Sequence, residues 1–282
     1  MARTLVAIFA CNEERRIAAC IRSLPLKSDR FTFHLLVNGS ADGTATVARA
    51  ITADVTSFHV HNLPIAGKAR TWNHFVRTLW DGSSACVFVD GDTVVMPGTL
   101  DAMVDTLASS PHANAVNAMP VSGRRQSSYR AAITAEHGIF GALYGLSGSF
   151  LQRLKVANIW LPADLIGDDG LIGALAKTDL GPEADWQNQR IANCPKAGFS
   201  FEEADWRVPA TWMLQGRRMV SYSIRRYQNI VISRIMRGAG PSGLPATMRE
   251  TYAANWHLFD VRARYAPFDL LAKRRMRQCT KL

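Results

Sequence analysis

The sequence of 282 residues lacks the features that mark several large classes of protein. No apolar run approaches the ~20 residues that a helix needs to cross a bilayer. The longest candidate, residues 139–151, is interrupted by three glycines. The five cysteines are scattered and show neither zinc-ligand nor redox spacing, which predicts reduced thiols. The glycine-rich motifs of dehydrogenases, P-loop enzymes and α/β hydrolases are also absent. We therefore expect a cytoplasmic protein that belongs to none of these classes.

Acidic residues are scarce at one end of the chain. Residues 1–200 hold 18 Lys and Arg against 17 Asp and Glu, whereas residues 201–282 hold 15 against 6. Within this basic end, residues 212–237 show apolar side chains at helical spacing, flanked by arginines. Such a helix could lie on an anionic membrane surface, at the inner face, or pack on the rest of the protein with a solvated basic side. The basic cluster at residues 273–277 favours an anionic surface. We do not expect nucleic acid as a partner, because no recognised reading motif accompanies the charge.

Strand and helix patterns alternate along the first half of the chain. Continuous apolar runs predict buried strands, and the segments between them have the periodicity of amphipathic helices. The predicted strands are residues 5–10, 31–37, 55–60 and 85–89, and the predicted helices start after Asn12, near Thr44, at Gly67 (through Leu79) and at Pro97 (through Leu107). This alternation indicates an α/β doubly wound sheet. Ligands of such sheets bind outside the carboxyl ends of the strands, so the loops at 10–13, 38–43 and 90–92 should border one cleft.

The strongest candidate for chemistry is Asp90-Gly91-Asp92, which follows the apolar run 87–89. The glycine lets the backbone turn, so that two carboxylates can converge on one hard cation. Mg²⁺ and Mn²⁺ sites of this kind use one or two carboxylates and leave positions for phosphate oxygens. Without the buried strand before it, the motif would be equally well explained as a solvated turn.

Other candidates are weaker when each is taken alone. Asp168 and Asp169 precede a helical stretch and are explained either as first-turn acids or as a general base with a raised pKa. Asn38 could face a nucleobase and Lys68 a phosphate, although both also suit ordinary turns and helix starts. The pair His59 and His61 shares a strand face, but it has no third ligand nearby in the sequence.

Taken in order, these segments resemble the family 2 glycosyltransferases, which have the GT-A fold. The matching segments are LVAIFACNEE at 5–14, NGSADGT at 38–44, GKARTWN at 67–73, VDGD at 89–92, Asp168-Asp169, and QGRRM at 215–219. The resemblance spans about residues 4–220. It implies a GT-A-like doubly wound mixed sheet flanked by helices over residues 1–210, followed by a basic, mostly helical region over 211–282.

The resemblance also implies an inverting, metal-dependent transfer of a sugar from a nucleotide-sugar donor to a hydroxyl acceptor, which could be a glycan, a lipid-linked acceptor or a small molecule. In that reading Asp92 and Asp90 hold Mn²⁺ or Mg²⁺, and Asp169, or next Asp168, is the base. The remaining expected contacts are with the nucleotide (Phe9, Ala10, Cys11, Glu13, Asn38, Lys68, Asp90 and Gly91) and with the acceptor or diphosphate (Gln215 and Arg218).

The sequence departs from the family pattern at three places. Phe9 stands where the first loop usually has proline, Asn38 where the second loop has a uracil-contacting aspartate, and Met219 where the last motif has tryptophan. The second change leaves the resemblance without an implied nucleotide base, and the third argues against a processive polysaccharide synthase. Two alternatives stay open: a nucleotidyltransferase, and a non-catalytic membrane-associated binding protein.

Overall fold

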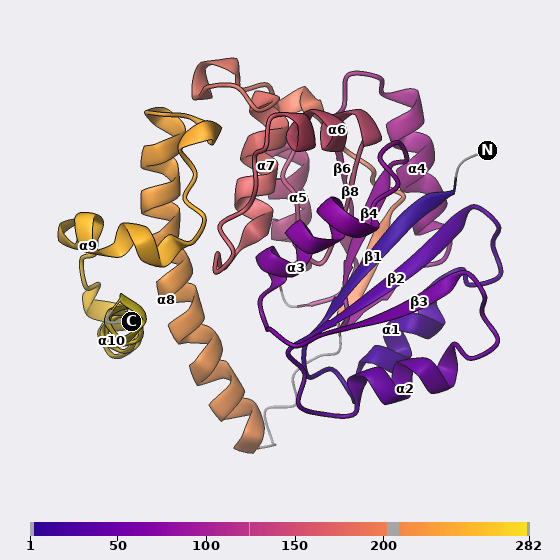
Figure 1. Cartoon of the computed structure of the whole chain (residues 1–282), viewed down its shortest axis with the longest axis horizontal. Coiled ribbons are helices and arrows are strands. Elements are labelled where there is room, and N and C mark those ends of the chain that lie inside the picture. The colour runs from indigo at the N-terminus through magenta and orange to yellow at the C-terminus, as the bar shows by residue number, and fades with distance from the viewer. Residues whose placement is uncertain (1–2, 124, 202–208, 281–282) are drawn as a thin grey trace.

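The computed structural model describes residues 3–123, 125–201 and 209–280. In this part of the chain, seven strands form one mixed sheet in the order β3-β2-β1-β4-β8-β6-β9, which Figure 1 shows at the centre of the molecule. Their bounds are β1 Thr4–Ala10, β2 Phe31–Asn38, β3 Phe58–Leu63, β4 Cys86–Asp90, β6 Ala115–Asn117, β8 Leu143–Leu146 and β9 Ile191–Ala192. Strands β1 to β4 run parallel, and β8 pairs antiparallel with β4 and β6. The carboxyl ends of the first four strands therefore share one edge.

Helices cover both faces of the sheet, as the sequence predicted. The alternation of β1 divides the core, since Leu5, Ala7 and Phe9 face one apolar cluster while Val6, Ile8 and Ala10 face the other. The first face packs against α3, α6 and α7, and the second against α1, α2 and α4. The helices are α1 Ile17–Ser23, α2 Thr44–Ile51, α3 Lys68–His74, α4 Thr99–Ser109, α5 Gln126–Glu136, α6 Gly148–Val156 and α7 Asp168–Thr178.

A second, three-stranded sheet has the order β5-β10-β7. Its strands are β5 Thr93–Val95, β7 Met119–Pro120 and β10 Gly198–Phe201. Strand β5 begins directly after Asp92 and pairs antiparallel with β10. The Asp90-Gly91-Asp92 turn is thus held at both ends, by β4 before it and by the pairing of β5 with β10 after it.

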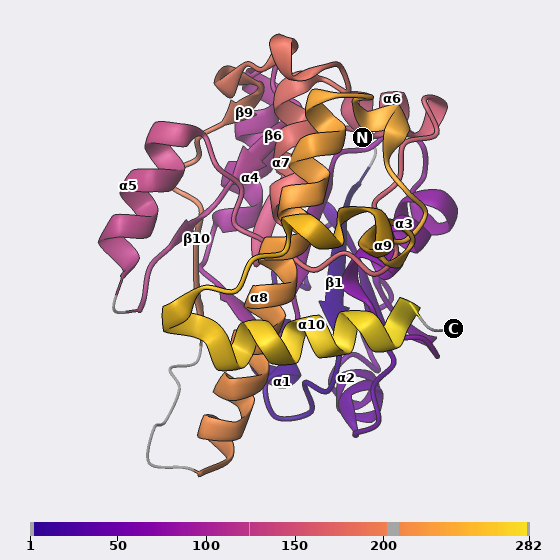
Figure 2. The ribbon, with the colours of Figure 1, turned by 90° about the vertical axis from the view of Figure 1, so that its left-hand side faces the viewer.

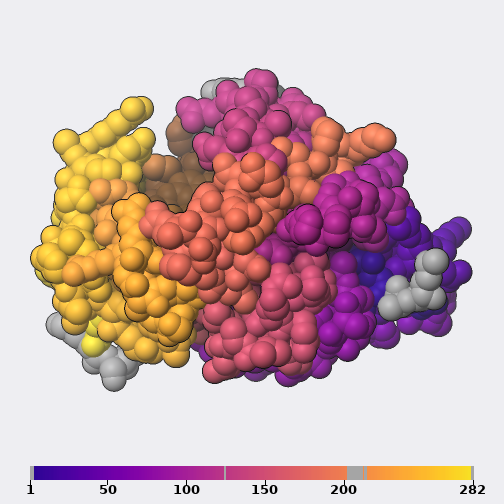
Figure 3. Space-filling view, turned by 90° about the horizontal axis from the view of Figure 1, so that it is seen from above, coloured from indigo at the N-terminus to yellow at the C-terminus, as the bar shows by residue number. Residues whose placement is uncertain are grey.

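The C-terminal region is mostly helical, as expected. Helix α8, Pro209–Arg237, is followed by α9, Tyr252–Asn255, and by α10, Ala266–Thr280, which lies across α8 (Figures 1 and 2). Two short helical turns follow α7, at Glu183–Asp185 and Asn188–Arg190. Four more connect α8, α9 and α10, at Pro241–Gly243, Met248–Thr251, Trp256–Leu258 and Ala263–Tyr265. Seen from above, the surface is hollowed between the yellow C-terminal segment and the rest of the molecule, with α8 at the floor (Figure 3).

Helix α8 packs on the rest of the protein along one side. Val220, Tyr227 and Val231 are buried in the same apolar cluster as Leu5 and Phe9 of β1. The amphipathic pattern of residues 212–237 therefore serves packing over the second half of the helix. No helix among the described residues is long and apolar enough to cross a membrane.

Three local predictions need correction. The helix predicted to start after Asn12 begins only at Ile17, because Asn12 has a φ of +57° and its side-chain oxygen accepts from the backbone of Ala41. The predicted strand at 55–60 is shifted to β3, because residues 52–57 form turns. The predicted helix from Gly67 to Leu79 is two elements, α3 and a π-helical turn at Phe75–Leu79.

Candidate active site

The turn after β4 carries the two candidate metal ligands, and the close approach of β1 fixes its position. Gly91 donates its backbone N–H to the carbonyl of Phe9 at 2.8 Å. A Cβ on Gly91 would lie only 2.8 Å from the Cβ of Ala10. Glycine is thus required between Asp90 and Asp92 because a side chain would push the turn away from the sheet.

Lys68, at the start of α3, lies among the acids that the sequence predicted. Its Nζ is 2.6 Å from Oδ1 of Asp90 and 3.7 Å from Oδ2 of Asp168, and it donates to the carbonyl of Gly141 at 2.7 Å. Burial alone lowers the pKa of Lys68, but Asp168 and Asp90 raise it well above its ordinary value. The ammonium therefore stays charged and links elements that are up to 100 residues apart in the sequence.

The acids around Lys68 are held in an unfavourable environment for charge. Burial raises the pKa of Asp90 to about 6, even though Lys68 lowers it. Burial also raises the pKa of Asp168, whose Oδ2 is buried and has no hydrogen-bond partner. Concentrated carboxylates with perturbed pKa values in one place are typical of functional sites.

Asp92 faces a different cation. Its Oδ2 is 3.3 Å from the guanidinium of Arg16, which also lies 2.7 Å from the carboxylate of Glu13. Burial and the charge of Asp92 raise the pKa of Glu13 to about 7, while Arg16 lowers it. Arg16 thus neutralises a pair of acids at the mouth of the first loop.

Asp169 forms its ion pair with a residue of helix α8 and not with Lys68. Arg225 of α8 donates to Oδ1 of Asp169 at 2.8 Å. Gly167 has a φ of +86°, and a Cβ on it would overlap the Arg225 side chain. A Cβ on Gly141 would lie 3.2 Å from Cγ of Asp169. Two glycines therefore make room for the Asp169–Arg225 pair, which has side chains 17% and 35% exposed.

The loops predicted to hold the nucleotide lie together, with a difference at Asn38. Its side chain is buried, donates to the carbonyl of Ala10 at 3.0 Å, and accepts from the backbone of Gly67 at 3.0 Å. Asn38 thus ties its own loop to the end of β1 and to the turn before α3, a structural role that needs no nucleotide. Phe9 and Ala10 are buried, while Cys11 is exposed.

The predicted residues of the last motif lie on α8 before Arg225. Arg218 is exposed and Gln215 is half-buried. Arg218 precedes Arg225 by seven residues, two helical turns, and so shares its side of the helix. Among the described residues of α8, Arg225 is the one that forms an ion pair with a candidate acid. Gln215 and Arg218 lie about 15 Å and 10 Å from Arg225 along the helix axis.

Sequence reasoning missed Arg16, Gly141 and Arg225. Arg225 was noted as one of several arginines flanking the amphipathic helix, and nothing in its spacing distinguishes it from Arg226. Arg16 lies in a helix-start segment rich in charge. Arg16 contacts Asp92 over 76 residues of sequence and Arg225 contacts Asp169 over 56, and no local pattern reveals such contacts.

The donor set suits a hard divalent cation that is shared with phosphates. Among the described residues, no group of three His, Cys, Asp or Glu side chains has the geometry of a complete metal site. Two carboxylates at one turn, Asp90 and Asp92, are nevertheless the usual protein share of an Mg²⁺ site in which phosphates supply other ligands. The chemistry of these two side chains therefore fits such a cation.

Comparisons with known proteins agree with this architecture. Several solved structures have the same fold: a mannosyltransferase from Pyrobaculum calidifontis in complex with GDP-Man and Mn²⁺ (19% identity, TM-score 0.61, covering 99% of this chain and 83% of that one), TarS 1-349 from S. aureus (15%, 0.56, 99% and 81%) and glucosyl-3-phosphoglycerate synthase from Mycobacterium tuberculosis in complex with Mn²⁺, UDP and glucosyl-3-phosphoglycerate (18%, 0.57, 86% and 81%). No curated protein matches the sequence. The family model described as "Glycosyl transferase family 2" matches residues 5–197. The chain therefore belongs to glycosyl transferase family 2 and is a glycosyltransferase.

Proposed function

We propose that the protein transfers a sugar from a nucleotide-sugar donor to a hydroxyl acceptor, with inversion at the anomeric carbon and with Mn²⁺ or Mg²⁺ as cofactor. The observation that carries the proposal is the meeting of Asp90, Lys68 and Asp168 within 3.7 Å, next to the Asp169–Arg225 pair. These groups come from the first loops of the sheet, from α7 and from α8. They lie at the edge where α/β sheets bind their ligands.

The donor side consists of Asp90, Asp92, Lys68 and Arg16. Held by Asp90 and Asp92, the divalent cation would act as a Lewis acid that stabilises negative charge on the departing diphosphate. Lys68 and Arg16 neutralise these carboxylates before a donor arrives, at 2.6 and 3.3 Å. Because the Lys68 and Arg16 side chains lie beside the carboxylates that would hold the divalent cation, they favour binding of an anionic donor there.

The acceptor side consists of Asp169 with Arg225. The carboxylate of Asp169 takes the proton of the acceptor hydroxyl, whose oxygen attacks the anomeric carbon. The bond from that carbon to the diphosphate oxygen breaks, and the nucleoside diphosphate leaves with the electron pair. A single displacement of this kind inverts the configuration. Asp168 is the second candidate, although its buried Oδ2 faces Lys68.

Solved structures with the same fold support a nucleotide sugar as the donor. Those structures include a complex with GDP-Man and Mn²⁺, one with UDP and Mn²⁺ and one with UDP and Mg²⁺. Because the relatives use different nucleotides, and because Asn38 is occupied by structural hydrogen bonds, we leave the base of the donor open.

The test is a release assay with nucleotide sugars and Mn²⁺, in which the products are separated by chromatography. The wild-type protein should release a nucleoside diphosphate, whereas a nucleotidyltransferase would form or consume pyrophosphate. Asp92→Asn should lose at least 100-fold of the metal-dependent release, and Asp169→Asn should keep donor binding but lose transfer. Asp101→Asn, on the exposed side of α4, is the matched control. Full activity of Asp92→Asn would refute the metal assignment.

We also propose that the outer face of α10 contacts an anionic membrane. Leu270 and Leu271 are 58% and 48% exposed, and they are followed on the same helix by exposed Arg274 and Arg275. Figure 2 shows α10 lying along the outside of the molecule. Apolar side chains beside a basic cluster match a bilayer with anionic headgroups.

Sedimentation with lipid vesicles tests this contact. The protein should bind vesicles that contain phosphatidylglycerol, bind phosphatidylcholine vesicles less, and dissociate as salt rises. Leu270→Glu with Leu271→Glu should abolish binding, whereas Val156→Glu, at a more exposed apolar position on α6, should not. Equal binding of both variants would exclude α10 as the contact.

A further inference from the structure

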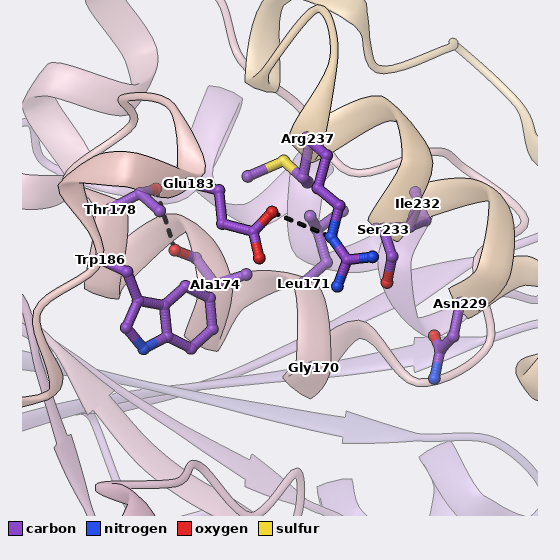
Figure 4. Close-up of a pocket in the computed structure, with 11 residues that line it drawn as sticks. Gly170, Leu171, Ala174, Thr178, Glu183, Trp186, Asn229, Ile232, Ser233 and Arg237 are labelled. Atoms are coloured by element: carbon purple, nitrogen blue, oxygen red, sulfur yellow. Dashed lines mark hydrogen bonds and ion pairs between the residues drawn. The ribbon is translucent and has the colours of Figure 1, made fainter.

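A groove lies between α7 and α8, beside the candidate base. It has a volume of about 280 Å³, close to the lower end of the ~300–1,000 Å³ that is usual for small-molecule sites. One wall is formed by α7 and the turn after it, and the other by the second half of α8. The lining includes Gly170, Leu171, Trp186, Asn229, Ser233 and Arg237, and Figure 4 shows them around the opening.

One end of the groove lies next to the acids. Gly170 directly follows Asp169, and Asn229 lies one helical turn after Arg225, which binds Asp169. A Cβ on Gly170 would meet nothing within 4 Å, so the groove is open at this point. The α8 wall continues from Arg225 to Arg237 for about 18 Å. A ligand lying along it could place one end near the candidate base.

The other end of the groove is closed by an ion pair. Arg237 donates to the carboxylate of Glu183 at 3.0 Å, and Figure 4 shows this bond across the pocket. Nearby, Arg226 is likewise paired with Asp260 at 2.6 Å. Because these two cations already have acidic partners, they offer little free charge to an anionic ligand.

The lining combines a flat aromatic surface with neutral polar groups. Trp186 is 44% exposed, and Lys177 approaches its ring at 4.8 Å from the centroid. Asn229 and Ser233 add an amide and a hydroxyl that can donate and accept hydrogen bonds. The apolar face of an indole can pack against the C–H face of a sugar ring. The N–H of Trp186 already donates to Oδ1 of Asn188 at 3.0 Å, so the ring would offer its face alone. This set of groups suits a neutral, polyhydroxylated ligand.

We propose that this groove is the acceptor subsite and that it binds a neutral saccharide, whose reacting hydroxyl extends past Gly170 towards Asp169. The assignment rests on the proposed transferase function. It gives Gly170 a specific role, because any side chain larger than a methyl group would obstruct the open end. It also gives Trp186 the role of a platform for the sugar ring.

Two variants separate this proposal from a purely structural role. Gly170→Leu fills the open end without strain, because Gly170 is helical and leucine favours helices more than glycine does. Trp186→Ala removes the platform from an exposed position. Ala108→Leu, on exposed α4 at the opposite face of the sheet, is the control. Binding is measured by saturation-transfer NMR with a panel of di- and trisaccharides of glucose, mannose and N-acetylglucosamine, and Mn²⁺-dependent nucleotide binding is measured in parallel.

At least one saccharide should bind the wild-type and Ala108→Leu proteins, and its affinity should fall at least tenfold in Gly170→Leu and in Trp186→Ala. Nucleotide binding should be unchanged in all of them. If no saccharide binds while nucleotide binding persists, or if both groove variants bind as well as the wild type, the acceptor subsite is refuted and the donor site is not. Absence of Mn²⁺-dependent nucleotide binding in the wild type would instead refute the proposed function.

Discussion

At the scale of single residues, the site is organised by pairs in which a cation offsets an acid. Lys68 lies beside Asp90, and Arg16 lies beside Asp92. The sequence could predict the acids, because they follow an apolar strand in a turn that contains glycine. It could not predict the partner of Asp92, because a salt bridge over 76 residues leaves no local pattern. Asp92, just past the end of a strand, is therefore more predictable than Arg16, which reaches it from a distant part of the sequence.

Replacing Lys68 by methionine tests this balance of charge. The change leaves Asp90 and Asp168 without their shared cation, so the protein should lose about 2 kcal/mol of stability. This is below the ~3–5 kcal/mol for a fully buried pair, because the Lys68 side chain is 26% exposed. Thermal unfolding should show the loss, and Mn²⁺ should restore part of it by neutralising Asp90. Lys196→Met, at an exposed site, is the control; an unaltered midpoint for Lys68→Met would contradict the account.

Gly91→Ala tests the close approach of the metal turn to β1. The added methyl would lie 2.8 Å from the Cβ of Ala10 and 3.1 Å from the carbonyl oxygen of Phe9. We expect a loss of about 1–3 kcal/mol, as for overpacked sites, and weaker Mn²⁺-dependent nucleotide binding. Urea unfolding and nucleotide titration measure the two effects. Gly216→Ala, where an added Cβ has no neighbour within 4 Å, should cost no stability.

At the scale of secondary-structure elements, prediction succeeded where a segment was long and periodic. The runs at 5–10 and 31–37 gave β1 and β2 almost to the residue. The short strands β6, β7 and β9 hold only two or three residues each and leave no periodicity to detect. The sequence analysis also found two histidines on β3 but not their neighbour on β2. Nδ1 of His34 lies 3.1 Å from Nε2 of His61, and the His34 ring stacks on that of His61 and lies tilted against that of His59, so that three imidazoles form one cluster.

This cluster predicts how stability depends on pH. Burial, with His61 and His59 nearby, lowers the pKa of His34 to about 4, and burial also lowers that of His61. The unfolded chain, with an ordinary histidine pKa near ~6.5, binds these protons more readily than the folded protein does. Stability from the neutral cluster is therefore complete above pH ~6.5 and falls as the pH drops towards 4.

Thermal unfolding between pH 7 and 4 measures this effect. His34→Phe, which removes the titrating group beside Phe75, should flatten the dependence. His112→Gln, at an exposed position, should keep the wild-type slope. The same slope in all three proteins would show that the cluster does not titrate as described.

At the scale of the whole molecule, the sheet and the C-terminal helices share a core. Tyr227 and Val231 of α8 and Met276 of α10 belong to the cluster that contains Leu5 and Phe88 of the sheet. The sequence indicated an amphipathic helix and a basic region, but it left open whether that helix would pack or lie on a membrane. A helix that packs on the protein and a helix that lies on a membrane have the same apolar periodicity, so the sequence pattern alone does not distinguish them.

A shared core predicts that the chain unfolds in one transition. We expect far-UV circular dichroism and tryptophan fluorescence to give the same urea midpoint, since neither region can keep its apolar surface buried alone. Tyr227→Ala should lower both midpoints together. Two separate transitions would show that residues 1–210 and 211–282 are independent folding units.

The central claim is that Asp90 and Asp92 bind a divalent cation together with the diphosphate of a nucleotide sugar. Isothermal titration calorimetry with GDP and with UDP, each with and without Mn²⁺, tests it most directly. The wild-type protein should bind at least one nucleotide only when Mn²⁺ is present, and Asp92→Asn should lose that binding while its far-UV spectrum stays unchanged. Binding that needs no metal, or that survives in Asp92→Asn, would contradict the claim.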